Sequence, residues 1–451
     1  MNCVPALILL ALPAFAQPLS IPQTVEAALR HYPSIQVSQE QVAAAAAGIQ
    51  LARTAYLPRV DVLAQVNRAT RNNVFGMLLP QSVIPSISGP VIGTNNFGTT
   101  FGSAAGGLVT WEPFDFGLRR ASVAAAAAGR AQSEAALRRT EYDVAVATAD
   151  ACLTLVAARE TVRAAQAGVD RAVTVSRTIH ALVEAELRPG ADAARADAEL
   201  AAARTQLIQS EQAVDIARSS LARFTGAEPA EVVVSAPKLG ELPPERPVPP
   251  LDPAANPIAR EQQAVIEQAQ AQLHALERQY FPRFYLQAAA YARGTGAELS
   301  GGFEGGATGL WPTTQNYALG FTVTFPVMDS ASIQAREAAQ SATIRAQTAR
   351  ARQIAVDLRA QFNAAVAALE GARRVAGNTP AEVTAARAAA DQATARYRAG
   401  LANIDEVAEA QRLLTQAEID DALARLNVWR ALLGIATAAG DIRPFLAEVG
   451  P

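Results

Sequence analysis

Cysteine and histidine are scarce in this sequence. Of its 451 residues, two are cysteine and three are histidine. Cys3 lies in a segment that we expect to be cleaved off, so Cys152 is left without a partner for a disulfide within the chain and is expected to be a packing residue. His31, His180 and His274 lack the spacing of metal ligands. We therefore expect no metal and no other cofactor.

The sequence also lacks a charge excess and a long apolar run beyond its first residues. Its 39 basic and 42 acidic side chains give a net charge of −3, so no nucleic-acid partner is expected. No stretch of about 18 uninterrupted apolar residues follows, which excludes membrane-spanning helices and leaves only strands for that role. A phosphate-binding glycine loop, a nucleophile elbow and a metal signature are missing as well, so we expect no enzyme.

The first residues are typical of a secretory signal. An apolar run from Val4 to Phe15 ends in the small-x-small pattern Ala14-Phe15-Ala16, which signal peptidase cuts. Residues 1–16 are therefore predicted to be a signal peptide, with Gln17 as the first residue of the mature chain. No cysteine directly follows the run, so a lipid anchor is not expected.

An internal duplication is the main feature of the mature chain. Residues Tyr56–Val62 recur as Tyr280–Leu286, an offset of 224 residues (282 − 58 for the prolines). Two further matches have offsets of 213 (326 − 113) and 210 (400 − 190), and pair Pro113–Gly117 with Pro326–Ser330 and Arg188–Gly190 with Arg398–Gly400. The predicted domains are a first repeat at 17–226, a proline-rich extended linker at 227–257, a second repeat at 258–440 and a C-terminal tail at 441–451.

Each repeat is predicted to run helix, strand, loop, strand, very long helix, glycine turn and second helix. The strands show alternation of apolar and polar residues, as in Val60, Val62 and Val66 against Asp61 and Gln65. The predicted strands are 59–68, 105–113, 283–293 and 316–326, and the loops rich in Gly, Asn, Ser, Thr and Pro are 71–103 and 294–314.

The helices are long and rich in alanine. Residues Ala121–Leu187 contain no internal proline and would reach roughly 100 Å at about 1.5 Å per residue. Further helices are predicted at Ala191–Phe224, Ala331–Ala376 and Ala381–Leu433. Small side chains allow close approach of helices, which suits a helical barrel. Four strands cannot close a β-barrel, and open edges in hydrocarbon cost several kcal/mol per unpaired group, so several copies must pool their strands.

Across essentially all of the mature chain, the sequence resembles the TolC-type outer-membrane efflux family. The resemblance rests on the duplicated plan, on Tyr-Leu-Pro-Arg or Tyr-Phe-Pro-Arg before each first strand, and on Pro113–Gly117 after the second. It implies a mixed α+β membrane protein, a homotrimer whose transmembrane β-barrel is shared, with four strands per chain, and continues into a long periplasmic α-helical barrel. It also implies a place in outer-membrane lipid with a large periplasmic portion, and docking to an inner-membrane pump through a periplasmic adaptor (membrane fusion protein).

By the same resemblance, the functional site lies at the periplasmic entrance of the tunnel. Glu406 and Glu409 share one helix face, and three copies would ring the opening with carboxylates, which favours cations. A solvated face near a helix N-terminus is the alternative. The pore and gate candidates are Glu406, Glu409, Tyr397 and Arg398, and the adaptor-contact candidates are Gly190, Gly400 and Leu401.

The sequence departs from the family pattern at two points. A basic gating residue is expected two positions after Gly400, where the chain has Ala402, and Arg398 is a candidate substitute. After Gly190, the first repeat has no acid at the position that matches Glu406, and Asp197 is one residue off.

These observations predict a passive exit duct for drugs or other small toxic compounds, served by a pump of the resistance-nodulation-division class. One alternative is a periplasmic coiled-coil adaptor, against which the two strand pairs and the duplication argue. Type I protein secretion and metal-ion efflux through the same channel are further alternatives.

Overall fold

The computed structural model describes residues 18–70, 98–296 and 305–450. The predicted signal peptide, most of the first predicted loop and residues 297–304 of the second lie outside these ranges. The described chain divides into two compact units, and each unit contains segments of both sequence repeats. One unit comprises the described residues up to Val42 together with 133–263 and 349–450, and the other comprises 43–132 and 264–348. Within the described ranges, no helix is both long enough and apolar enough to cross a membrane.

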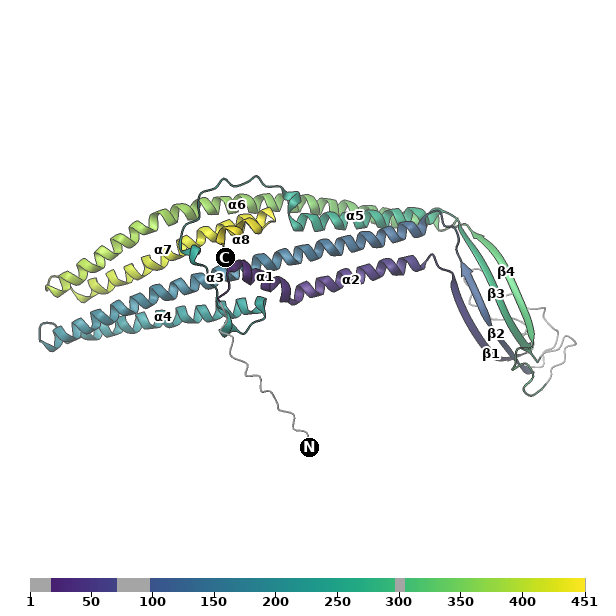
Figure 1. The fold of residues 1–451 in the computed structure, drawn as a ribbon, viewed down its shortest axis with the longest axis horizontal. Helices are drawn as coiled ribbons and strands as arrows, with labels where there is room; N and C mark the ends of the chain where they lie inside the picture. The colour runs from purple at the N-terminus through teal and green to yellow at the C-terminus, as the bar shows by residue number, and fades with distance from the viewer. Residues whose placement is uncertain (1–17, 71–97, 297–304, 451) are drawn as a thin grey trace, which may run out of the picture. The chain divides into compact units, whose positions relative to one another are not determined.

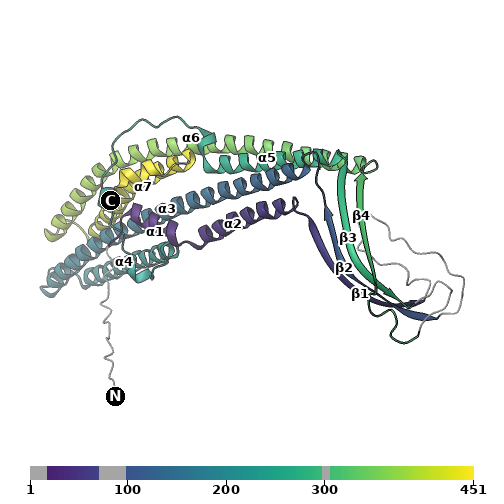
Figure 2. The same ribbon diagram turned by 45° about the vertical axis from the view of Figure 1, so that its right-hand side comes forward.

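The second unit contains an antiparallel sheet with the strand order β1-β2-β3-β4 (Figure 2). The strands are β1 (Arg59–Thr70), β2 (Thr99–Trp111), β3 (Arg283–Thr295) and β4 (Thr314–Thr324). Strand β2 begins six residues before its predicted start, within the predicted loop, because Gly102, Gly106 and Gly107 hide the alternation of this segment. Gly106 is required by close packing, since a Cβ there would overlap the carbonyl oxygen of Ala290 and Cβ of Tyr291.

The apolar face of this sheet is bare in the single chain. Val62 and Tyr317 are 86% and 89% exposed, and Val60, Val66 and Leu319 are exposed as well. Asp61, Gln65 and Asn67 of β1 alternate with the valines and are partly buried. The sheet therefore presents apolar side chains outward, the reverse of an ordinary globular sheet, which buries its apolar face.

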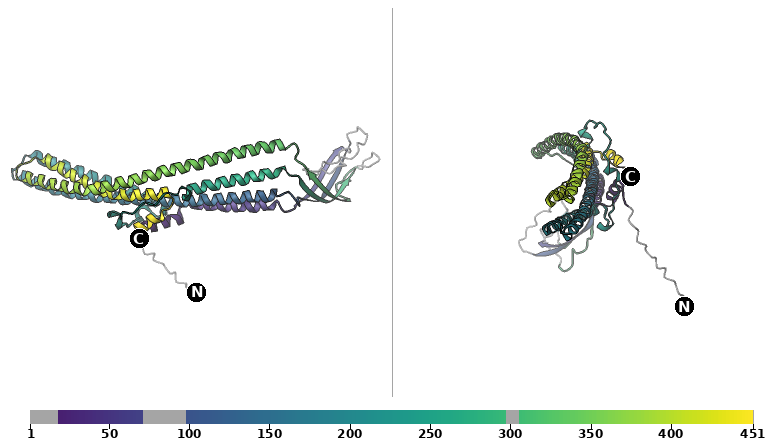
Figure 3. Two further views of the ribbon diagram at one scale, coloured as in Figure 1. Left: turned by 90° about the horizontal axis from the view of Figure 1, so that it is seen from above. Right: turned by 90° about the vertical axis from the view of Figure 1, so that its left-hand side faces the viewer.

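The first unit is built around two pairs of helices that lie side by side, α3 with α4 and α6 with α7 (Figures 1 and 3). The bounds of the described helices are α1 (Ile21–His31), α2 (Pro33–Thr54), α3 (Leu118–Glu184), α4 (Gly190–Thr225), α5 (Pro257–Glu277), α6 (Ser330–Arg398), α7 (Ile404–Ala439) and α8 (Arg443–Val449). The segment predicted as an extended linker contains the short 3-10 turns Pro229–Glu231, Pro237–Gly240 and Pro253–Ala255. It buries Val234 and Leu239 in one cluster with Leu155, Leu221 and Trp429, so it is packed onto the helices.

Helix α6 runs without a break through Pro380, so the predicted helix end at Ala376 is wrong. A proline inside a helix removes one backbone hydrogen bond and normally kinks or ends the helix. Here α6 packs on α7 on both sides of the proline, through Ala376 before it and Ala386 after it. Thr379 Oγ1 also donates a hydrogen bond to Asp421 Oδ1 on α7 at 2.7 Å. Tertiary packing thus overrides the local penalty.

Replacing this proline is expected to stabilise the protein. Pro380 is exposed, so Pro380→Ala loses no packing and removes a helix penalty of up to about 3 kcal/mol. The midpoint of thermal unfolding in detergent should rise. Pro33→Ala is the matched control, because Pro33 is an exposed residue at the first position of α2, where proline is well tolerated. A midpoint for Pro380→Ala at or below that of the wild type would contradict this explanation.

Candidate pore entrance at the helical hairpin tips

Two helical hairpins, α3–α4 and α6–α7, end in tips of matching geometry. Helix α3 ends at Glu184 and α6 at Arg398, while α4 begins at Gly190 and α7 at Ile404. Both comparisons give one offset of 214 residues (398 − 184 and 404 − 190), and α4 and α7 each have 36 residues. The repeats therefore superpose in register at the tips.

The tip of α6–α7 is a Schellman turn centred on Gly400. Its φ of +80° is left-handed, which glycine adopts at no cost. The Leu401 N–H donates to the Arg396 carbonyl at 2.8 Å and the Gly400 N–H to the Tyr397 carbonyl at 3.0 Å, the two bonds that define this motif. Asn403 then caps α7 by accepting from the Glu406 N–H at 2.9 Å.

The tip of α3–α4 makes the same turn without glycine at its centre. Glu186 has the left-handed φ of +58°. The Leu187 N–H donates to the Leu182 carbonyl and the Glu186 N–H to the Val183 carbonyl, both at 2.9 Å. Gly190 is instead the first residue of α4. The pairing of Gly190 with Gly400 in the sequence is therefore wrong. The residue equivalent to Gly400 is Glu186, which occupies the left-handed position of the first turn.

The corrected register changes three equivalences between the tips. Asp192 corresponds to Glu406 (406 − 192 = 214), so the first repeat does carry an acid at that position. Leu187 corresponds to Leu401, and these two leucines are similarly exposed, at 69% and 70%. Arg188 takes the place of Ala402 (402 − 188 = 214). Sequence reasoning missed Leu187, Arg188 and Asp192, although each follows once the tips are aligned by their helix ends.

Tyr397 joins the two tips. Its side chain is only 2% exposed, and its hydroxyl donates a hydrogen bond to Asp192 Oδ2 at 2.7 Å. The Arg188 guanidinium lies 4.3 Å from the centre of the Tyr397 ring and donates to the Tyr397 carbonyl. Burial, followed by the hydrogen bond to Asp192, raises the pKa of Tyr397 to about 12. The hydroxyl therefore stays a donor at any physiological pH.

The other gate candidates lie near the same tips and have arginine neighbours. The Glu406 carboxylate is 3.9 Å from Arg396, and the Glu409 carboxylate is 3.1 Å from Arg412. Both glutamates remain substantially exposed. Arg398 is exposed, and Arg188 is the basic residue that contacts Tyr397.

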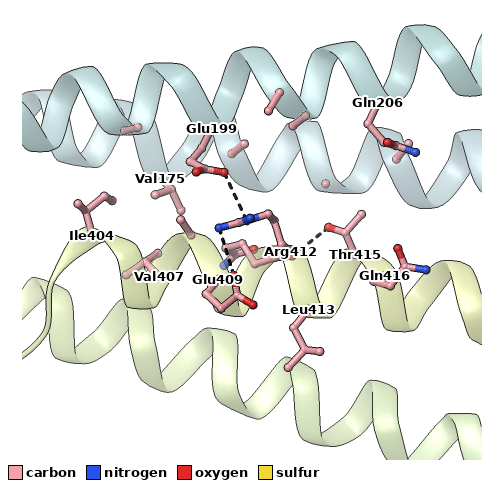
Figure 4. A pocket seen from close by; sticks show the side chains of 18 of the residues that line it. Val175, Glu199, Gln206, Ile404, Val407, Glu409, Arg412, Leu413, Thr415 and Gln416 are labelled. Atoms are coloured by element: carbon pink, nitrogen blue, oxygen red, sulfur yellow. Dashed lines mark hydrogen bonds and ion pairs between the residues drawn. The ribbon is translucent and has the colours of Figure 1, made fainter.

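Glu409 also belongs to a chain of alternating charges between α4 and α7. Arg412 lies between Glu409, at 3.1 Å, and Glu199, at 3.6 Å (Figure 4). Arg195 continues the chain, at 3.0 Å from Glu199 and 3.4 Å from Asp405. Glu199, Glu409 and Arg412 line a cavity of about 520 Å³. Its lining also includes small residues of α3, α4 and α7, among them Ala165, Gly168, Ala172, Ala196, Ala202 and Ala408. The second helices of the two hairpins are thus joined by charge across an apolar gap.

Neither metal binding nor thiol chemistry is indicated in the described part of the chain. Its His, Cys, Asp and Glu side chains form no group of three or more that could hold a metal ion. Cys152 is fully buried, and burial raises the pKa of its thiol to about 12, which leaves it unreactive.

Comparison with known proteins identifies the fold. The model of the family described as outer membrane efflux protein matches residues 24–227 and 254–441. No curated protein sequence matches the chain. Similar solved structures include the outer-membrane channel OprN, at 20% identity and TM-score 0.71, covering 93% of this chain and 89% of that chain. The CmeC outer-membrane channel of Campylobacter jejuni is 15% identical with TM-score 0.73, covering 93% and 85%. The MtrE outer-membrane channel of Neisseria gonorrhoeae, solved in its open state, is 18% identical with TM-score 0.68, covering 93% and 89%.

At these identities the solved structures establish the fold, while the family model covers both repeats with a gap at the linker. The resemblance seen in the sequence is confirmed. The chain belongs to the outer membrane efflux protein family, whose members are passive channels rather than enzymes.

Proposed function

We propose that this chain is the exit duct of a tripartite export system in the cell outer membrane. Three copies pool their sheets into one transmembrane barrel, and the long helices continue it as a tunnel in the periplasm. The duct passively conducts small molecules that an inner-membrane pump delivers through a periplasmic adaptor.

The sheet carries this proposal. Its exposed face is apolar, with Val62, Tyr317 and Leu319 largely bare, which suits contact with lipid. Among the described residues, β1 pairs with β2 alone and β4 with β3 alone, so each of these strands has one free edge. In hydrocarbon every unpaired backbone group costs several kcal/mol, and joining β1 of one copy to β4 of the next removes both edges.

The hairpin tips form the periplasmic entrance in this proposal. Glu406 and Glu409 line the opening, and with their symmetry mates they favour cations. Tyr397 holds the entrance closed through Asp192. The open state in which MtrE was solved supports an entrance that changes conformation, since that channel has the same fold.

A pump of the resistance-nodulation-division class and drug-like cargo are the preferred partners within this function. Protein secretion and metal-ion efflux through the same duct stay as alternatives. The periplasmic adaptor alternative is not retained, because the family match is to channels. Reconstituted export with each pump class in turn would separate the channel alternatives.

The acidic entrance can be tested by ion selectivity. We expect Glu406→Gln/Glu409→Gln to weaken the cation preference of single channels in planar bilayers, measured as a shift of the reversal potential toward zero in a salt gradient. Divalent cations added from the periplasmic side should block the wild type several-fold more strongly than the variant, because carboxylate pairs bind them.

Glu211→Gln is the control, since Glu211 is an exposed acid of α4 well beyond the tip. It should leave selectivity unchanged. Unchanged selectivity in the double variant would place the two glutamates on a solvated helix face. Failure of the wild type to insert into bilayers would contradict the duct itself.

The adaptor contact can be tested at the two exposed leucines. Because Leu187 and Leu401 present bare apolar side chains at equivalent tips, we expect Leu187→Ser/Leu401→Ser to weaken capture of the cognate periplasmic adaptor by roughly tenfold or more. Leu51→Ser is matched in exposure, at 72%, and lies in α2 of the other unit. Equal loss in both variants, or none in either, would exclude the tips as the docking surface.

A further inference from the structure

Arg188 makes the closest basic contact to Tyr397, although it comes from the other hairpin and the other repeat. Its guanidinium lies over the ring at 4.3 Å and donates to the Tyr397 carbonyl. A Cβ on Gly400 would lie 4.0 Å from its Nη2 atom, so the guanidinium also reaches the centre of the second turn. One side chain of the α3–α4 tip thus touches both the ring and the backbone of the α6–α7 tip.

Tyr397 is held from the first hairpin at three points. Asp192 Oδ2 accepts a hydrogen bond from its hydroxyl at 2.7 Å, and Arg188 covers its ring and donates to its carbonyl. The Tyr397 carbonyl also accepts the Gly400 N–H at 3.0 Å, one of the two bonds of the Schellman turn. Arg188 therefore acts on an atom that fixes the shape of the second tip.

The contact is one-sided. By the shared offset of 214, the position of Arg188 in the first tip is taken by Ala402 in the second, and Ala402 is buried and carries no charge. The first hairpin therefore supplies the only guanidinium of this equivalent pair, and the second hairpin supplies its target. The two repeats therefore differ at this position, and the arginine of the first repeat links the two hairpins of one chain.

We propose that Arg188 is a positioning residue that holds the α6–α7 tip against the α3–α4 tip within each chain and so sets the resting closed state of the entrance. This inference rests on the proposed duct function. Arg188 acts through Tyr397, by the stacking of a planar guanidinium and by a charge-assisted hydrogen bond to the carbonyl.

The test uses three arginine variants of the full-length protein in planar bilayers. Arg188→Met keeps the length of the side chain and removes its charge and donors. We expect it to raise the open probability, or the basal conductance, by roughly tenfold, since it loses both a cation–π contact and a charge-assisted hydrogen bond. Arg188→Lys keeps the charge but not the planar fork, so it should fall between Arg188→Met and the wild type. Arg163→Met, on α3 with an intrahelical partner in Glu160, should equal the wild type.

A double-mutant cycle separates positioning from general stability. Tyr397→Leu removes the ring and keeps the backbone carbonyl, so Arg188→Met should have a smaller effect in the Tyr397→Leu background than in the wild type. Additive effects of the two changes would overturn the proposal, because they would show that Arg188 does not act through the Tyr397 ring. Wild-type conductance in Arg188→Met would overturn it as well.

Amide hydrogen exchange in detergent provides a readout that does not require conduction. In Arg188→Met, the amide hydrogens of Gly400 and Leu401 should exchange with solvent roughly tenfold faster than in the wild type. The amides around Leu155 in α3 should keep their protection. If wild-type protein forms no channels, the duct function fails, and this exchange measurement still decides whether Arg188 holds the second tip. Unchanged exchange at Gly400 and Leu401 would overturn the inference even in a conducting channel.

Discussion

Pairing of backbone groups at the sheet edges is the constraint on which the rest of the structure depends. A chain with two strand pairs forms one antiparallel sheet, and its outer strands β1 and β4 each keep an edge with no partner in the described chain. The apolar face of the same sheet is bare. In the proposed duct, association of copies pairs both free edges, and membrane lipid covers the apolar face. The duplicated plan then follows, since each repeat contributes one hairpin to the sheet and one pair of long helices.

Long alanine-rich helices suit this plan because small side chains let neighbours pack closely along their whole length. Such packing is uniform and specifies the register of the helices poorly. The polar contacts between the helices help to fix that register. A series of alternating acidic and basic side chains links α4 to α7: Asp405, Arg195, Glu199, Arg412 and Glu409. Exposed pairs of this kind contribute little stability individually, so their structural effect is to align two helices. At the tips, where the helices end, Tyr397 and its partners perform the same task with buried groups.

The two repeats share a backbone turn at their tips but carry different side chains there. Both tips form the same Schellman turn, one centred on Gly400 and the other on Glu186. The tips differ in the side chains at equivalent positions: the first tip has Arg188 where the second has Ala402, and Asp192 where the second has Glu406. Because the side chains differ, Arg188 and Asp192 of the first tip can contact Tyr397 of the second tip without an equivalent contact in the reverse direction. The two tips therefore share their backbone geometry and differ in the side chains that this backbone carries.

The sequence by itself determined the order of elements, the duplication, the alternation of the strands and the family. These are local or repeated signals, because a period of two and long runs of helix formers act over neighbouring residues. Tertiary structure decided three things that local rules predict wrongly or not at all. Glu186 takes the left-handed conformation that glycine normally marks, because the turn's two hydrogen bonds offset its strain. Helix α6 continues through Pro380 because α7 packs on both sides of it. Arg188 meets Tyr397 across 209 residues of chain, and such a contact exists only once two hairpins lie side by side.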